Sequence, residues 1–368
     1  MRPFHALSLT LLLTLSCVTR ETKVPSKVKL EPKEKTIRSV LGLGYDGLKH
    51  QSRGLCIDLQ GEREVHTKTL VEFGWQRVKT HRELAKAIYG DTDLNHAFGL
   101  MAERKKRDFI LAAPIEPYGV YFLGRAQVSL KSTLLIEPTL KVESYEAFAE
   151  YGAGWFRKSC GDEFVLGYKE GGELFVLVGM KARDRGEADE ISDLFELVIR
   201  DQEDADVKTM VRELEETHEL SYHVFQNGGP RVEMKLRSLS QATDTLKTYT
   251  KSVGVDNATR FSFILQSYRD LILPEGKKPM NYESIQHKLG RLFEEQLKLK
   301  GLREGNQFIL RNKLQFRDEQ VARAKRSLKE ISAFERKLQG IQESCRNALA
   351  VCHKRKISVP DQELPLRS

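Results

Sequence analysis

The residues Cys160-Gly161-Asp162-Glu163-Phe164 lead into the pair Gly171-Gly172 and then into the apolar run 174–180. A helical pattern at 145–159 ends at the first of these glycines, and a strand follows that we expect to break at the glycine pair. Glycines at such positions indicate a bend, a bulge or the close approach of another backbone. The segment after the glycine pair, 174–180, is apolar on both faces of a strand, so we expect both faces of its sheet to be covered.

The rest of the chain alternates between strand and helix patterns. Strand patterns lie at 65–75, 118–142, 161–182 and 220–225, and helical patterns lie at 81–106, 145–159 and 184–219. Two further helices are expected at 238–253 and 260–273. This order predicts an α+β fold in which helical segments are inserted between successive strands.

The glycines of the opening stretch resemble a motif of the membrane-attack-complex/perforin (MACPF) and cholesterol-dependent cytolysin superfamily. Gly161 and Phe164 match the glycine and final aromatic residue of its Tyr/Phe-Gly-Thr-His-Tyr motif, which sits at a helix-to-strand junction. Gly171 and Gly172 stand at the spacing of the Gly-Gly pair that follows this motif. Cys160, Asp162 and Glu163 depart from the usual residues.

Two other segments resemble the same family. Gly42, Gly44 and Tyr45 match a Gly-x-Gly-Tyr-Asn/Asp segment near the start of such domains, and Gly228-Gly229 resembles a later Gly-Gly pair. The resemblance covers residues 37–275. It implies a bent antiparallel sheet of about four strands with two helical inserts, 81–117 and 184–219. The alternative is an unrelated α+β surface domain with glycine bends.

The two inserts bear on whether such a protein forms pores. In lytic members of the family they refold into membrane hairpins, which requires apolar and polar residues to alternate. Here both inserts keep a helical period, and 184–219 is rich in carboxylates that each cost a few kcal/mol at mid-bilayer. We therefore expect no pore formation at neutral pH. The acidic insert is expected to stay on the sheet through Ile191, Phe195, Val198 and Leu214.

The N-terminus has the pattern of a bacterial lipoprotein signal peptide. Residues 1–17 contain Arg2, an apolar run too short to span a bilayer, and then Leu15-Ser16-Cys17, which resembles a lipobox. We expect palmitate-type lipidation of Cys17, with ordinary cleavage after Ser16 as the alternative. Val18 favours the outer membrane of the cell envelope. Residues 18–36 are polar and predict a flexible tether, and 356–368 predict a disordered tail.

The C-terminal region repeats apolar residues at steps of three and four. Over residues 276–355 this pattern predicts two long helices that pack as an antiparallel hairpin. A coiled coil with a partner chain, including a second copy, is the alternative.

Four cysteines remain after Cys17, an even number in an exported chain. Cys345 and Cys352 would be about 10 Å apart along one helix, so they can pair only if the helix ends between them. Cys56 and Cys160 are the other candidates for a disulfide. No metal site is expected.

Composition and motifs favour a surface role over catalysis. The chain of 368 residues carries a net charge of +8, which in an exported protein favours anionic surfaces over nucleic acid; a solvated helical surface is the alternative. The glycines at 42–47 are not followed by a helix, so no nucleotide cofactor is expected, and no hydrolase or metalloprotease motif occurs. We expect a lipoprotein acting at a membrane or surface. The alternatives are a non-lytic binding or scaffold lipoprotein and a secreted enzyme of unrecognised family.

Overall fold

The computed structural model describes residues 40–59, 63–90, 101–117, 119–182, 185–200, 205–347 and 352. The predicted signal peptide 1–17 with Cys17, the tether 18–36 and the tail 356–368 lie outside these residues. Their predictions therefore stay predictions.

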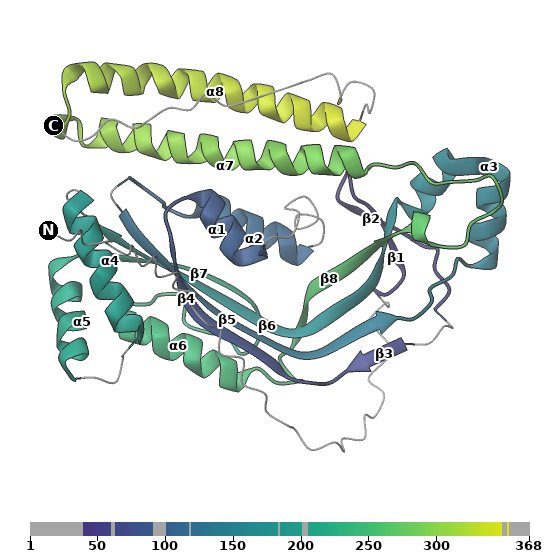
Figure 1. Ribbon diagram of the computed structural model, residues 1–368, viewed down its shortest axis with the longest axis horizontal. Helices are drawn as coiled ribbons and strands as arrows, with labels where there is room; N and C mark the ends of the chain where they lie inside the picture. Colours follow the sequence, from purple (N-terminus) through teal and green to yellow (C-terminus); the bar gives the residue numbers. More distant parts are fainter. Residues whose placement is uncertain are drawn as a thin grey trace, which may run out of the picture.

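A bent antiparallel sheet runs through the molecule (Figure 1). At its centre β5 (Gly119–Leu135) pairs with β6 (Glu163–Lys181) along nearly its whole length. β4 (Leu70–Val78) and β3 (Arg63–His66) line the outer side of β5 one after the other. β7 (Leu220–Gly228) and β8 (Thr259–Ser267) line the outer side of β6 in the same way. The sheet thus has four rows of strands, as the family resemblance implied.

The strand β8 corrects one prediction, because a helix was expected at 260–273. Residues 259–267 are rich in Thr, Phe and Ile, which favour strands, but their apolar spacing fits both periods. The first half of β6 would otherwise present unpaired backbone groups at an edge, and β8 satisfies them from Glu163 to Gly171. Only the short 3-10 turn η2 (Tyr268–Asp270) is helical there.

The strand containing Gly171-Gly172 also differs from its prediction. It does not break at the pair but continues as one 19-residue strand. The irregularity lies in the pairing, where the register shifts between Ser129 and Lys131 of β5 opposite Gly171. The glycines therefore lie at a bend in a continuous strand, next to a bulge in β5 at Leu130.

Helices cover both faces of the sheet, as predicted (Figure 1). α1 (His81–Tyr89) and α2 (Met101–Ala112) pack on one face, over Phe175 and Leu177 of β6. The opposite face carries α4 (Arg185–Arg200), α5 (Ala205–Thr217) and α6 (Leu239–Ser252). The alternate β6 residues Leu174, Val176 and Val178 contribute to that second core. The order of strands and inserts is the one expected for a MACPF-like α+β fold.

The far end of the sheet is closed by α3 (Val142–Cys160) and a small hairpin. The hairpin comprises β1 (Leu43–Asp46) and β2 (Gln51–Leu55), and it joins the sheet where Gly44 pairs with Phe164. A disulfide between Cys56 and Cys160 fastens the segment after β2 to the end of α3. This disulfide confirms one predicted pair.

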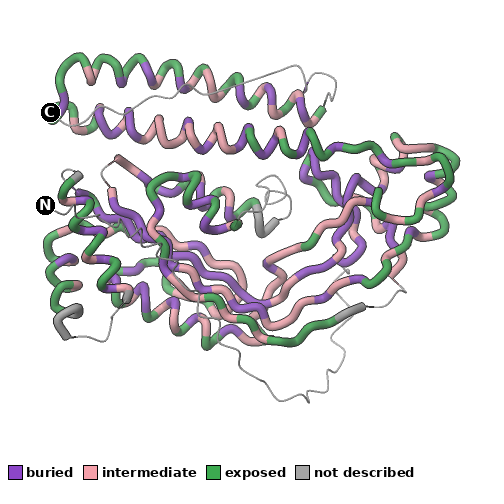
Figure 2. The backbone as a smooth tube through the Cα atoms, viewed as in Figure 1, coloured by how far each residue is buried: buried purple, intermediate pink, exposed green. Residues whose placement is uncertain are grey.

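Two long helices, α7 (Glu283–Arg311) and α8 (Asp318–Asn347), form the predicted hairpin above α1 and α2 (Figure 1). A short link with the turn η3 (Lys313–Gln315) joins them. Figure 2 shows buried residues on their facing sides and exposed residues along the outer side of α8. The described part of α8 ends at Asn347, and Cys345 forms a disulfide with Cys352, which confirms the second pair. Among the described helices, none combines the length and apolar character needed to cross a bilayer.

Candidate functional site: the two helical inserts and their attachments

The second insert is held to the sheet by its apolar side. Ile191, Phe195 and Val198 of α4 and Leu214 of α5 are buried in the same core as β6. The ring of Phe195 stacks on Phe122 with centroids 3.8 Å apart and meets Trp75 edge-on. The carboxylates on the opposite side of α4 are exposed: Asp189, Glu190, Asp193 and Glu196. This burial agrees with the attachment expected from the sequence.

The first insert begins at a capped helix. The Thr80 hydroxyl accepts a hydrogen bond from the Glu83 backbone N–H at the start of α1. His81 is buried, with Nε2 hydrogen-bonded at 2.9 Å to the carbonyl oxygen of Ala113. That contact joins the start of α1 to the end of α2, so the two helices form one unit.

A buried ion pair ties α2 to the sheet. Lys106 Nζ lies 2.9 Å from Glu173 Oε2, and the two side chains are 7% and 1% exposed. Burial raises the pKa of the Glu173 carboxyl, while Lys106 opposes this shift. Asn227 Nδ2 donates a second hydrogen bond to Glu173, at 3.3 Å. The pair therefore places a charge inside the core, directly after the glycine bend.

Four of the predicted motif glycines meet at this bend. A Cβ on Gly171 would overlap the carbonyl oxygen of Val128, and one on Gly172 would overlap the Tyr249 hydroxyl. Gly228 and Gly229 have φ of +71° and +70°, and a Cβ on Gly228 would lie 2.5 Å from the Gly171 oxygen. Tyr249 OH donates to the Gly228 carbonyl at 2.8 Å. The two Gly-Gly pairs thus serve close backbone packing.

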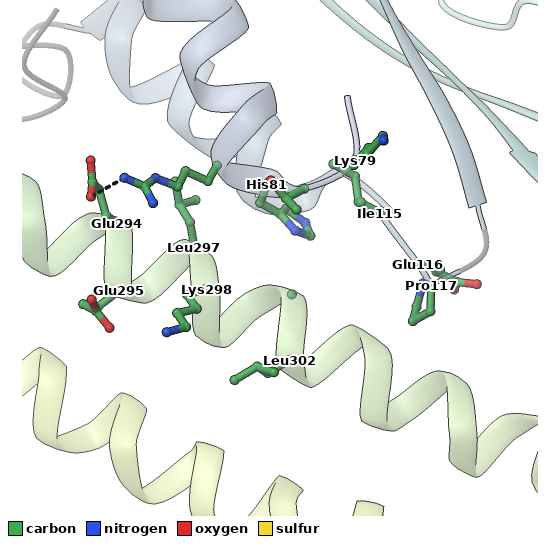
Figure 3. A pocket seen from close by; sticks show the side chains of 13 residues that line it. Lys79, His81, Ile115, Glu116, Pro117, Glu294, Glu295, Leu297, Lys298 and Leu302 are labelled. Atoms are coloured by element: carbon green, nitrogen blue, oxygen red, sulfur yellow. Dashed lines mark hydrogen bonds and ion pairs between the residues drawn. The ribbon is translucent and has the colours of Figure 1, made fainter. Parts of the chain in front are cut away.

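The C-terminal hairpin covers the first insert. Phe293 and Leu297 of α7 belong to the same buried cluster as Leu84 of α1 and Phe109 of α2. An ion pair joins Arg82 of α1 to Glu294 of α7 at 3.2 Å (Figure 3). Between them lies an open pocket of about 560 Å³, which Leu297 and Lys298 line from α7. The insert cannot leave the sheet without breaking these contacts.

The remaining motif residues meet at the junction of β1, α3 and β6. A Cβ on Gly44 would overlap the Cys160 carbonyl oxygen, and one on Gly161 would overlap the Tyr45 carbonyl oxygen. Phe164 is fully buried, with its ring 5.0 Å from that of Tyr268. Gly42 donates its N–H to the Val165 carbonyl at 2.8 Å. The structure therefore brings the residues of the first two motifs together.

The turn between β1 and β2 connects this junction to the hairpin. Leu48 at its tip is fully buried in a cluster with Ile285 and Leu289 of α7 and Ile341 of α8. Asp46 behind it accepts from Arg53 at 2.7 Å and from Arg157 at 3.0 Å. Burial acts to raise the pKa of Asp46, but the hydrogen bonds and both arginines hold it below its usual value.

Two further carboxyls are buried at the same junction. Asp162 Oδ1 accepts the Gly47 backbone N–H at 2.7 Å, and the Gln286 side chain donates to Glu163. Burial is the main cause that raises the pKa of Asp162 and of Glu163 to about 7. A Cβ on Gly47 would lie 2.9 Å from Glu163 Oε2, so the turn is packed against these groups.

These carboxyls give the protein a specific pH dependence. Between about pH 4 and pH 7 the unfolded chain releases a proton that folded Asp162 retains, so stability falls as the pH rises through this window. Asp162→Asn keeps an oxygen for the Gly47 N–H and removes this cost. We expect it to be more stable than wild type by roughly 1–3 kcal/mol at pH 8, with the difference vanishing near pH 4. Urea unfolding at several pH values measures both.

The test compares the unfolding free energies of Asp162→Asn and wild type at each pH, because His50 changes stability with pH in the opposite direction to Asp162. The pKa of His50 is lowered to about 4, mainly by burial, so it costs stability as the pH falls below about 6.5. Asp270→Asn neutralises an exposed carboxyl that lines the cavity beside Asp162, and it is the matched control. A constant difference between Asp162→Asn and wild type across the pH range would contradict the assignment.

The buried carboxyls at the junction join the β1–β2 turn and α7 to the start of β6. A cavity of about 480 Å³ lies beside Asp162 and Glu163, and carboxyls titrating near 7 beside a cavity are the feature that would favour an enzyme. Asp162 accepts a backbone hydrogen bond from the β1–β2 turn, and Glu163 is bonded to Gln286 of α7. Within the described ranges, no three His, Cys, Asp or Glu side chains are placed to hold a metal ion.

The sequence patterns did not identify the charged groups that attach the inserts and the hairpin. Glu173 carried a local signal, because it is the one carboxylate between Gly172 and the apolar run. Lys106 and Arg157 carried none, since their partners come from distant segments. A buried charge inside an apolar strand requires a partner, and that requirement could have been stated in advance.

Comparison with solved structures finds several partial alignments, one of them to a protein whose name includes a MAC/Perforin domain. GNIP1Aa from Chromobacterium piscinae aligns at 15% identity and a TM-score of 0.41, covering 70% of this chain and 55% of that one. Stonustoxin aligns at 11% identity and a TM-score of 0.43, covering 86% and 41%. A cell invasion protein with a MAC/Perforin domain from Bacteroides thetaiotaomicron aligns at 14% identity and a TM-score of 0.37, covering 71% and 61%.

The chain therefore spans only about 41–61% of the length of these three structures. No protein-family model matches the sequence, and no curated protein matches it significantly.

Proposed function

We propose that this protein is an envelope lipoprotein whose MACPF-like domain acts at a membrane or surface without forming pores at neutral pH. The observation that carries the proposal is the folded state of both inserts, each packed through apolar residues on its own face of the sheet. The first insert is further held by the Lys106–Glu173 pair and by the covering helix α7. The exposed carboxylates of α4 oppose its entry into lipid.

Dye release from vesicles tests the proposal that the protein forms no pores at neutral pH. We expect the purified protein to release no dye from phosphatidylcholine or phosphatidylglycerol vesicles at pH 7.4, because the carboxylates of α4 would have to enter the bilayer charged. Detergent lysis of the same vesicles gives the maximum signal.

A cross-linked variant makes this test specific to the first insert. Arg82 and Glu294 are partly exposed and face each other across α1 and α7. In Arg82→Cys/Glu294→Cys, a short bismaleimide would fix the insert under the hairpin, and the reagent-treated Arg82→Cys single variant is the control. Dye release by the wild type that only the cross-linked pair abolishes would overturn the non-lytic proposal and indicate a pore former.

The lipid anchor has a separate test. If Cys17 carries acyl chains, Cys17→Ser will move the protein from the membrane fraction to the soluble fraction, because the chains supply the membrane affinity. Intact-mass measurement of the mature wild type will show the added lipid. A mature chain that keeps an unmodified Cys17 would contradict the anchor, while leaving the fold-based part of the proposal standing.

A non-lytic scaffold is the second candidate, favoured by the covered state of the first insert under α7. In that case the protein binds a partner at the envelope and neither inserts into lipid nor changes shape. Electron microscopy on vesicles distinguishes the two: protein bound to vesicles without rings supports action at the membrane, and vesicles without bound protein support the scaffold. Ring-shaped assemblies would indicate a pore former and contradict both.

A further inference from the structure

A small pocket lies where the first insert meets the turn between β1 and β2 and the C-terminal hairpin. Its volume is about 270 Å³. Three of its lining residues are basic and come from three different elements: His50 from the turn, Arg107 from α2 and Arg346 from α8. Three amides complete its polar lining, Gln296, Gln339 and Gln342. The apolar lining comes from Leu111 of α2 and from Leu289 and Phe293 of α7, so the pocket is a formed cavity between packed helices.

Among the described residues, the guanidinium groups of this pocket have one ion pair, between Arg107 and Asp108. Arg107 pairs at 3.3 Å with its exposed neighbour Asp108, and its Nε atom is buried without a hydrogen bond. Arg346 Nε is likewise buried and unbonded. Burial lowers the pKa of Arg346, and the charge of Arg107 lowers it further. The two guanidinium groups therefore repel each other in a partly desolvated site.

The surroundings increase this positive character. Arg104 Nη2 donates to the His50 carbonyl oxygen at 2.7 Å, which places a third arginine beside the pocket. Besides Asp108, two acidic side chains act on these groups, but Asp46 is already bound to Arg53 and Arg157, and Glu343 is exposed. His50 Nδ1 is bonded to the Tyr45 hydroxyl at 3.0 Å, and the structure shows no bond to its Nε2 from a described residue.

We propose that this pocket binds a tetrahedral oxyanion of the phosphate class, held between Arg107 of α2 and Arg346 of α8. Guanidinium groups donate paired hydrogen bonds to such oxygens, and two guanidinium groups that repel each other beside a small cavity favour a compact dianion. The glutamine amides supply further donors. Because Arg107 and Arg346 belong to the first insert and to the hairpin, the bound anion would also fasten these two elements together.

Calorimetry with inorganic phosphate on the purified full chain, in low-chloride buffer, tests the site. We expect saturable binding, with an affinity that falls about tenfold or more in Arg107→Gln and in Arg346→Gln, because each variant removes charge-assisted hydrogen bonds. Arg336→Gln is the control, since Arg336 is exposed on the same helix and does not line the pocket. Phosphate should also slow hydrogen exchange of the α2 amides.

Thermal melts separate loss of the site from loss of the fold. Without phosphate, Arg346→Gln should melt no lower than wild type, because it relieves repulsion; with phosphate, wild type alone should gain stability. Flotation with phosphatidic acid vesicles, compared with phosphatidylcholine, identifies the source of the anion. Flotation that depends on Arg346 indicates a lipid headgroup, and binding of free phosphate alone indicates a soluble oxyanion. No binding of either probe, or equal binding by Arg346→Gln and Arg336→Gln, would overturn the proposal.

Discussion

Lys106→Met is expected to destabilise the protein by about 3–5 kcal/mol at neutral pH. The substitution leaves the Glu173 carboxylate buried without its countercharge, 1% exposed and 2.9 Å from the lost ammonium group. The penalty should shrink at pH 5, because a buried carboxyl without a cation takes up a proton. Urea unfolding at pH 8 and pH 5 measures the loss and its pH dependence.

Two controls show whether the loss comes from the ion pair. Lys105→Met removes an exposed lysine from the same helix and should cost less than about 0.5 kcal/mol. In the double variant Lys106→Met/Glu173→Leu, both charges are gone, so most of the stability should return. If Lys106→Met unfolds like Lys105→Met, the pair does not hold the insert to the sheet.

This pair also shows what could and could not be predicted from the sequence. The apolar period of 174–180 was sufficient to predict a strand covered on both faces, and the acidic helix kept the four apolar contacts expected of it. Both predictions depend on local periodicity. The partner of Glu173 depends on tertiary packing, since nothing near Lys106 in the sequence distinguishes it from the neighbouring lysine and arginine residues.

The dependence on tertiary packing also explains why a helix was wrongly expected at 260–273. Residues 259–267 have an apolar spacing that fits a helix as well as a strand, and the choice is made by the unpaired half of β6. The anion pocket is a stronger case, because His50, Arg107 and Arg346 lie on separate elements and carry no shared motif. The cysteines were more tractable: two candidate pairs were left, and spacing showed that Cys345 and Cys352 could pair only if the helix ended between them.

A second large loss of stability is expected from substitution of Gly171, at the glycine bend of β6. In Gly171→Ala the new methyl group would overlap the carbonyl oxygen of Val128, which is backbone and is fixed by pairing of β5 with β6. The chain must either shift β5 or give up hydrogen bonds at the bulge, so we expect a loss of roughly 2–4 kcal/mol. Thermal and urea unfolding of the variant measure it.

Gly74→Ala provides the matched control, since it lies in β4 of the same sheet and a Cβ there would have no neighbour within 4 Å. That variant should be neutral or slightly stabilising, because alanine reduces the freedom of the unfolded chain. If both variants unfold alike, the bend accommodates a side chain and the close approach at Gly171 is not required. If only Gly171→Ala is damaged, the cost comes from the bend, where the methyl group meets the Val128 carbonyl and where the backbone has a φ of +156° that alanine rarely adopts.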